Sequence, residues 1–118
     1  ALYGAIRHLA NPASLDVMPV SEMVEDHASM APLTVAKTAA IVAHLRMLAA
    51  VELLAAAQAV DLRDLPPTAL GDGARRAHLA VRARVGRLDG DRPLGPDIEA
   101  INAVIEAREL PLADLLAK

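Results

Sequence analysis

The longest regular feature of the sequence is an apolar stretch over residues 33–62 that contains neither Gly nor Pro. Pro32 stands just before it, where the first turn of a helix tolerates proline, so the pattern predicts one helix over 33–62. At about 1.5 Å per residue this helix spans roughly 45 Å, more than the diameter of a small domain. Its polar side chains do not gather on one face, which predicts burial on most sides. The polar residues of this helix are Thr34, Lys37, Thr38, His44, Arg46, Glu52, Gln58 and Asp61.

Shorter apolar repeats predict the remaining elements. Residues 1–10 have the spacing of the end of a helix, which the following Asn-Pro pair terminates. Residues 13–31 have irregular apolar spacing and are predicted to form a loop. Two further helices are predicted over 74–88 and over 97–109. No segment alternates as a strand does, so the predicted fold class is all-α. The apolar stripe of the last helix consists of Ile98, Ile101 and Ile105.

A membrane span is one alternative for the long helix. His44, Arg46 and Glu52 interrupt its middle, and no uncharged apolar stretch reaches the ~20 residues that a span needs. We therefore expect other helices to cover it. Since the rest of the chain offers only short helices, the cover is expected from absent sequence or from other subunits. The chain starts without an initiator Met, a leader or a capping signal, so we expect it to be the later part of a longer polypeptide.

Composition narrows the choice of function. Hydrophobic residues make up 54% and charged residues 23%, which is enough apolar surface for a folded chain. Tyr3 is the sole aromatic residue, so the core must consist of aliphatic side chains and closely packed helices. The net charge of -3 argues against a general binder of polyanions. The absence of Cys excludes a disulfide framework, a Cys-ligated zinc site and a cysteine nucleophile, and it fits a cytoplasmic location.

Histidines and arginines offer two further candidate sites. The four His residues lie far apart without a metal-ligand spacing, so we expect satisfied or solvent-facing histidines and no metal site. Half of the basic residues lie between residues 75 and 92. Aromatic side chains that could stack on bases are missing among them, and the arginines face different sides of the predicted helix. A solvated face or ion pairs at a subunit contact is therefore favoured over nucleic-acid binding.

Three consecutive ionisable residues, Glu25, Asp26 and His27, precede the long helix and are flanked by methionines. Burying a carboxylate is costly unless it is paired or used, so this acidic cluster is a candidate functional site. The alternative is structural. Asp26 or Ser29 would cap backbone amides, and Glu25 would interact with the positive end of the helix. Spacing alone favours the structural interpretation.

The string Glu25-Asp26-His27-Ala28-Ser29-Met30 resembles the Glu-Asp-His-Val-Ser-Met signature of the histidine ammonia-lyase branch of the aromatic amino acid lyase family. Residues 8–14, 52–63 and 91–100 are also similar to family segments, in the right order and at the right distances. The resemblance extends over nearly the whole chain. It implies that residues 1–118 form the C-terminal part of a large helical-bundle enzyme several times longer.

The resemblance also implies a chemistry. Enzymes of this family eliminate ammonia from histidine, phenylalanine or tyrosine, and some relatives shift the amino group instead. Their electrophile is a methylidene-imidazolone (MIO) group formed from an internal Ala-Ser-Gly, and no metal is involved. This sequence contains no Ala-Ser-Gly, and the tyrosine that serves as general base belongs to segments outside it. The 118 residues alone are therefore expected to be inactive.

Glu25 matches the active-site glutamate of the histidine branch, where phenylalanine and tyrosine enzymes usually have Gln. A carboxylate there can hold the ammonium or imidazole of the substrate and relay a proton, so Glu25 is the predicted catalytic residue. Val24 and Glu25 are the predicted substrate-binding residues, although Val24 replaces a usual Gln or Asn and loses a polar contact. Asp26 and His27 are predicted to have structural roles near the site. Two further departures are Val20 and Ala31, where Thr and Gly are common.

The resemblance therefore predicts part of an ammonia-lyase that acts on histidine and gives urocanate. An aromatic amino acid aminomutase or a phenylalanine or tyrosine ammonia-lyase is the alternative within the family. A non-catalytic helical oligomerisation module is the alternative of another class. The expected partners are the remainder of the same polypeptide, further copies in a homotetramer and a small amino acid substrate. Neither nucleic acid nor a membrane is expected as a partner.

Overall fold

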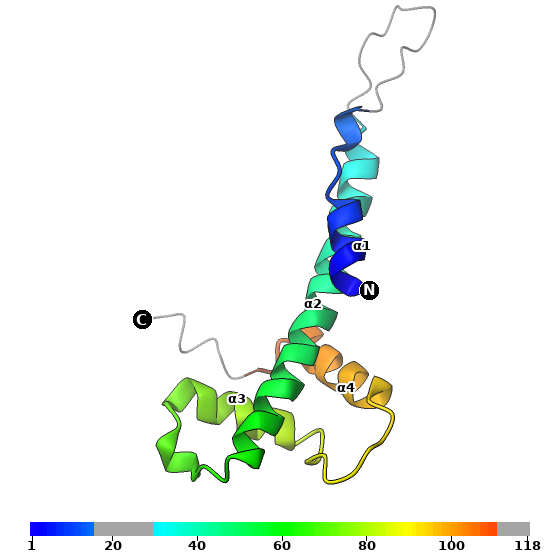
Figure 1. Ribbon diagram of the computed structural model, residues 1–118. Helices are drawn as coiled ribbons and strands as arrows, with labels where there is room; N and C mark the ends of the chain where they lie inside the picture. The colour runs from blue at the N-terminus through cyan, green and yellow to red at the C-terminus, as the bar shows by residue number, and fades with distance from the viewer. Residues whose placement is uncertain (16–29, 111–118) are drawn as a thin grey trace, which may run out of the picture. The chain divides into compact units, whose positions relative to one another are not determined.

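The computed structural model describes residues 1–15 and 30–110, and these residues form helices joined by short connections, with no strand among them (Figure 1). This confirms the all-α prediction. Residues 16–29, which hold the predicted acidic cluster, lie outside the described part of the chain. The elements are α1 (Leu2–Leu9), the 3-10 turn η1 (Ala13–Leu15), α2 (Ala31–Leu62), the 3-10 turn η2 (Pro67–Ala69), α3 (Asp72–Arg82) and α4 (Gly95–Glu106).

The chain divides into two compact units, Ala1–Leu45 and Arg46–Lys118. In the first unit, α1 lies beside the first half of α2 (Figure 1). The apolar stripe of α1 is half-buried while its polar residues are exposed, as the helical spacing of the stripe predicts. Ala13, in η1, is the buried residue of this unit's described part. The half-buried stripe consists of Leu2, Ala5, Ile6 and Leu9.

The core of the second unit is a cluster in which α3, α4 and the loop between them meet the second half of α2. Alanines are the buried side chains that α2 contributes, with Leu53 and Leu54 of α2 partly buried against them. Small side chains let helix axes approach closely. Val81 and Ile101 are the largest fully buried side chains. An ion pair between Arg46 and Glu106, 2.9 Å long, adds a polar contact between α2 and α4. The buried cluster comprises Ala50, Ala57, Val81, Val85 and Ile101.

Helix α3 ends at Arg82, six residues before the predicted end at residue 88. The guanidinium of Arg82 donates hydrogen bonds to the carbonyls of Val85 and Gly86, each 3.2 Å long. Side-chain donors therefore replace the backbone donors that a continued helix would have supplied. The predicted extension of α3 to residue 88 was wrong because this side chain offers the backbone another partner.

Helix α4 ends at Glu106 instead of residue 109. Arg108 has a left-handed backbone with φ 59°, and the amide of Glu109 donates to the carbonyl of Val104 over 3.0 Å. The amide of Arg108 also donates to the carbonyl of Ile105 over 3.1 Å. Together these bonds form a Schellman motif, which terminates a helix. Since glycine usually occupies the left-handed position and arginine does so here, the sequence carried no signal for this end.

Most of α2 is exposed within the described chain, and Ala50 and Ala57 are its buried residues. Six large apolar side chains along it are more than one-third exposed, namely Leu33, Val35, Val42, Leu45, Val51 and Leu62. By length and composition α2 could also cross a membrane, a property that it shares with core helices of soluble proteins. The expected cover by absent segments or other subunits stays a prediction.

Candidate functional site

The predicted site residues Val24, Glu25, Asp26 and His27 all lie in the segment 16–29, outside the described residues. Their placement and roles stay predictions. Both flanks of the segment are described, and both contact the first turns of α2.

The entry flank begins where α1 ends. Ala10 is the C-cap of α1, and Asn11 and Pro12 lead into η1. The Lys37 ammonium donates a hydrogen bond to the backbone carbonyl of Asn11. Because Pro12 has no N–H and cannot continue the helix, Asn11 lies just beyond the carboxyl end of α1, where a cation is favoured.

The exit flank is the start of α2. Met30 has a left-handed backbone with φ 47°, and its carbonyl accepts bonds from the amide and the hydroxyl of Thr34, 2.9 and 3.1 Å long. Pro32 lies in the first helical turn, where its missing N–H leaves no helical bond unmade. The helix therefore starts at Ala31, two residues before the predicted position.

A second candidate arrangement lies between α2 and α3. One carboxylate oxygen of Asp61 is 2.7 Å from His78 Nε2, and the other accepts a bond of 2.7 Å from Arg82 Nε. These side chains are only 14%, 19% and 16% exposed, respectively. The sequence pattern did not predict this cluster, although His78 and Arg82 are four residues apart on one helix face.

The pKa of the Asp61 carboxyl lies below its ordinary value of 3.8. Partial burial, the largest single influence, raises this pKa. The hydrogen bond from His78 and the charge and hydrogen bond of Arg82 together outweigh it. Asp61 is therefore a carboxylate at neutral pH, held between two donors. Such a group joins α2 to α3 and is not suited to take up a proton near pH 7.

This lowered pKa predicts an acid-dependent loss of stability. A carboxyl whose pKa is lower in the folded state stabilises it fully above the ordinary pKa, and that contribution disappears as the pH falls below 3.8 through the lowered value. We expect Asp61→Asn to lower the melting temperature of the full-length protein at pH 6. The gap between variant and wild type should narrow toward pH 3. A gap independent of pH would contradict the prediction.

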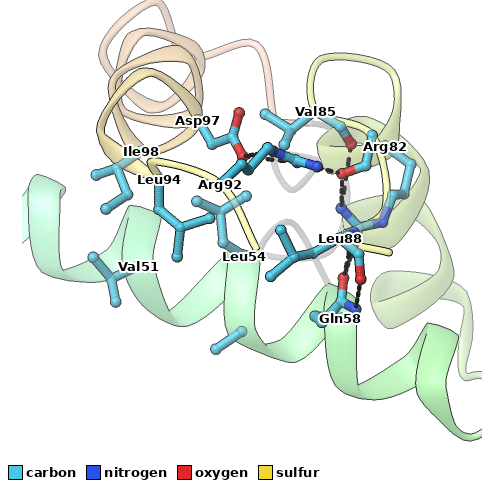
Figure 2. Close-up of a pocket in the computed structure, with 12 residues that line it drawn as sticks. Val51, Leu54, Gln58, Arg82, Val85, Leu88, Arg92, Leu94, Asp97 and Ile98 are labelled. Atoms are coloured by element: carbon cyan, nitrogen blue, oxygen red, sulfur yellow. Dashed lines mark hydrogen bonds and ion pairs between the residues drawn. The ribbon is translucent and has the colours of Figure 1, made fainter. Parts of the chain in front are cut away.

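A cavity of about 190 Å³ lies between α2 and the loop that joins α3 to α4, and its lining residues are drawn in Figure 2. The Gln58 amide exchanges two hydrogen bonds with the backbone of Leu88, 2.9 and 3.0 Å long. Arg92 donates to the carbonyls of Gly86 and Arg87 and to the Asp97 carboxylate. The polar side chains at the rim thus bind the loop itself, and the interior is apolar, with Val51, Leu54, Val85, Leu88, Leu94 and Ile98 among its lining residues.

The arginine-rich stretch makes its ion pairs inside the chain. Arg84 pairs with Glu109 at 2.7 Å, and Arg92 pairs with Asp97 at 2.8 Å. The sequence favoured a solvated face or ion pairs at a subunit contact, whereas the ion pairs of the described residues have their partners in the same chain. Among the described residues no group of His, Asp and Glu could hold a metal ion. The remaining paired arginines are Arg75 and Arg76 with Asp72, Arg82 with Asp61, and Arg87 with Asp89.

The long alanine-rich helix and the short helices packed on it define a segment of a helical-bundle protein. The chain belongs to the aromatic amino acid lyase family, whose model matches residues 1–83. This confirms the family resemblance found in the sequence.

Among similar curated proteins, histidine ammonia-lyase from Symbiobacterium thermophilum is 43% identical over 105 residues, which are 89% of this chain and 20% of that protein. Histidine ammonia-lyase from Stigmatella aurantiaca is 39% identical over 110 residues, covering 93% of this chain and 21% of that protein. The chain therefore spans about a fifth of the length of these relatives.

A solved structure shows the same fold. Ergothionase from Treponema denticola, an ergothioneine-degrading enzyme crystallised with desmethyl-ergothioneine sulfonic acid, superposes with a TM-score of 0.85 at 34% identity. The match covers 93% of this chain and 22% of that one. The described helices thus correspond to one portion of a much larger helical protein.

Proposed function

We propose that these residues form the C-terminal part of a histidine-ammonia-lyase-like enzyme that eliminates ammonia from histidine and releases urocanate. The observation that carries the proposal is the identity of about 40% to histidine ammonia-lyases over about 90% of the chain. Glu25 adds to it, because a glutamate is the residue of the histidine branch at this position.

In the proposed reaction, the Glu25 carboxylate accepts charge-assisted hydrogen bonds from the substrate's ammonium or imidazole and relays a proton. Val24 beside it contributes an apolar contact. The MIO group would supply the electrophile for the departing amine. No Ala-Ser-Gly occurs in these 118 residues, so the residues that form the group would belong to the rest of the polypeptide.

The exposed apolar length of α2 supports a place inside an assembly of several copies, a homotetramer, together with the rest of the polypeptide. A core helix accounts for α2 better than a membrane span, since α3 and α4 pack on its second half and Arg46 pairs with Glu106 there. We propose that the full-length protein is a soluble cytoplasmic enzyme that contacts neither membrane nor nucleic acid.

The test is a substrate screen with the full-length protein. Histidine, phenylalanine and tyrosine are incubated separately, with ammonia release and the unsaturated acid as readouts. Urocanate from histidine supports the proposal, and a β-amino acid product supports an aminomutase. Ergothioneine joins the screen because the Treponema denticola relative degrades it. No turnover of any substrate would favour the non-catalytic oligomerisation module.

We further expect the isolated 118-residue chain to be inactive and to self-associate. It lacks the electrophile, and the exposed apolar side chains of α2 have no cover in the described chain. Light scattering of the purified chain should give a mass above that of the 12.4 kDa monomer. Ammonia release from histidine by this chain alone, or a clean monomer, would contradict the prediction.

A further inference from the structure

The apolar cavity of about 190 Å³ lies wholly within the second unit, so one compact body supplies all of its walls. Helix α2 forms one side, and the loop after α3 together with the first turn of α4 forms the other. In Figure 2 the side chains of Leu54, Leu88 and Leu94 lie together between these elements. Aliphatic side chains therefore make up most of the wall, and they attract a ligand through burial of apolar surface and dispersion.

The polar side chains of the wall already have partners. Gln58 Oε1 accepts bonds from the amide of Leu88 and from Arg82, 3.0 and 3.3 Å long. Asp97 Oδ2 accepts two bonds from Arg92, 3.1 and 2.8 Å long. A charged ligand would lose its hydration here and would have to break one of these bonds to gain a partner. The wall therefore suits an uncharged, apolar ligand.

The volume of the cavity sets the size of this ligand. An aliphatic cavity of about 150 Å³ stays dry and holds benzene or xenon, because an ordered water needs about two to four polar partners. A cavity of about 190 Å³ is thus large enough for one six-membered ring. Val51 and Leu94 mark its opening, since they are 38% and 45% exposed. A molecule of this size can enter between them.

A small molecule fits this opening better than a peptide segment does. A peptide brings backbone amides and carbonyls, which need hydrogen-bond partners when they are buried. The polar side chains of the wall are engaged with the loop and with each other, as the bonds of Gln58 and Arg92 show. A small apolar molecule brings no such groups, so its burial leaves nothing unpaired.

We propose that this cavity is a binding site for one small, uncharged, apolar molecule of the size of benzene. The ligand contacts Leu54 on α2, Val85 in the loop and Ile98 on α4 at the same time. Because it binds the folded arrangement of these elements, it stabilises the second unit against unfolding. The inference does not depend on the proposed function.

The first test uses xenon and benzene as probes of the full-length protein. Crystals under xenon pressure should show one xenon atom in contact with Leu54, Val85 and Ile98. In solution, the melting temperature should rise with the concentration of benzene. A cavity without xenon, or one filled by a side chain from another part of the full-length protein, overturns the proposal.

The second test fills the cavity. Ala55 lines it, whereas the neighbouring Ala56 does not, and both are exposed residues of α2. Leucine is a good helix former at either position. Ala55→Leu should weaken benzene binding at least about tenfold, as changes of one or a few methylenes do in apolar pockets. Ala56→Leu is the matched control and should bind benzene as the wild type does.

Gly86→Leu fills the cavity from the side of the loop and serves if Ala55→Leu does not fold. Gly86 lines the cavity, and a Cβ added there would meet no atom within 4 Å. We again expect benzene to bind at least about tenfold more weakly. Wild-type benzene binding in the cavity-filling variants that fold, or an equal loss in Ala56→Leu, overturns the proposal.

Discussion

Glu25→Gln in the full-length enzyme is expected to lower turnover of histidine about 10²- to 10⁴-fold, with the melting temperature nearly unchanged. Glutamine keeps the size of the side chain and its hydrogen-bonding capacity but removes the negative charge that, in the proposed function, holds the substrate and relays a proton. General acid–base catalysis contributes effects of this size. Steady-state turnover and thermal unfolding of the variant and the wild type measure the two quantities.

Asp26→Asn is the matched control for this prediction, because it neutralises the neighbouring carboxylate. We expect it to lose more stability and less turnover than Glu25→Gln. A capping role for Glu25 makes the opposite prediction, with a loss of under about 1 kcal/mol in stability and almost no change in turnover. Wild-type turnover in Glu25→Gln would therefore contradict a catalytic role for Glu25 and favour the structural role of the acidic cluster.

Asp61→Ala should lower the free energy of opening of α3 by about 2 kcal/mol. The substitution leaves the Arg82 guanidinium and the His78 ring with their carboxylate partner removed, and both side chains are less than one-fifth exposed. A largely buried cation that lacks its carboxylate partner destabilises the folded state, because the lost hydration of the cation is no longer offset by the ion pair. Native-state hydrogen exchange of the α3 amides measures this opening.

Asp72→Ala is the control for burial. Asp72 also pairs with two arginines, 2.5 Å from Arg75 and 2.9 Å from Arg76, but its side chain is 48% exposed. Hydrogen bonding by Arg75 is the largest influence on the pKa of Asp72 and lowers it. We expect a clearly smaller loss than for Asp61→Ala, since solvent screens an exposed pair. Equal losses would show that burial does not set the strength of the Asp61 cluster.

The hydrophobic pattern predicted which segments are helical, because the spacing of apolar residues and the positions of proline are local properties. The pattern did not predict the observed start of α2 or the observed ends of α3 and α4. The end of α3 depends on where Arg82 places its donors, and the end of α4 depends on a left-handed arginine. Neither follows from residue type, because many other arginines continue a helix.

The candidate sites also differ in whether local sequence could predict them. Glu25 was predicted through the string of residues around it, which is readable in one dimension. The contact of Asp61 with His78 and Arg82 joins residues 17 and 21 positions apart and exists only once α3 packs on α2. The bond from Lys37 to Asn11 likewise needs the turn after α1 to bring the two together. Such contacts need the packed arrangement of the helices and have no signature in the sequence.

The alanines of α2 determine which positions of the second unit can tolerate amino-acid substitutions. Ala50 has no exposed surface, so a larger side chain there would point into the packed core and is expected to force its neighbours apart. The larger buried side chains of the contact are Val81, Val85 and Ile101, which lie on α3, in the loop after it and on α4, respectively. Variation in this part of the protein is therefore expected to concentrate on α3, α4 and the loop between them, while α2 serves as a fixed template that sets their distance.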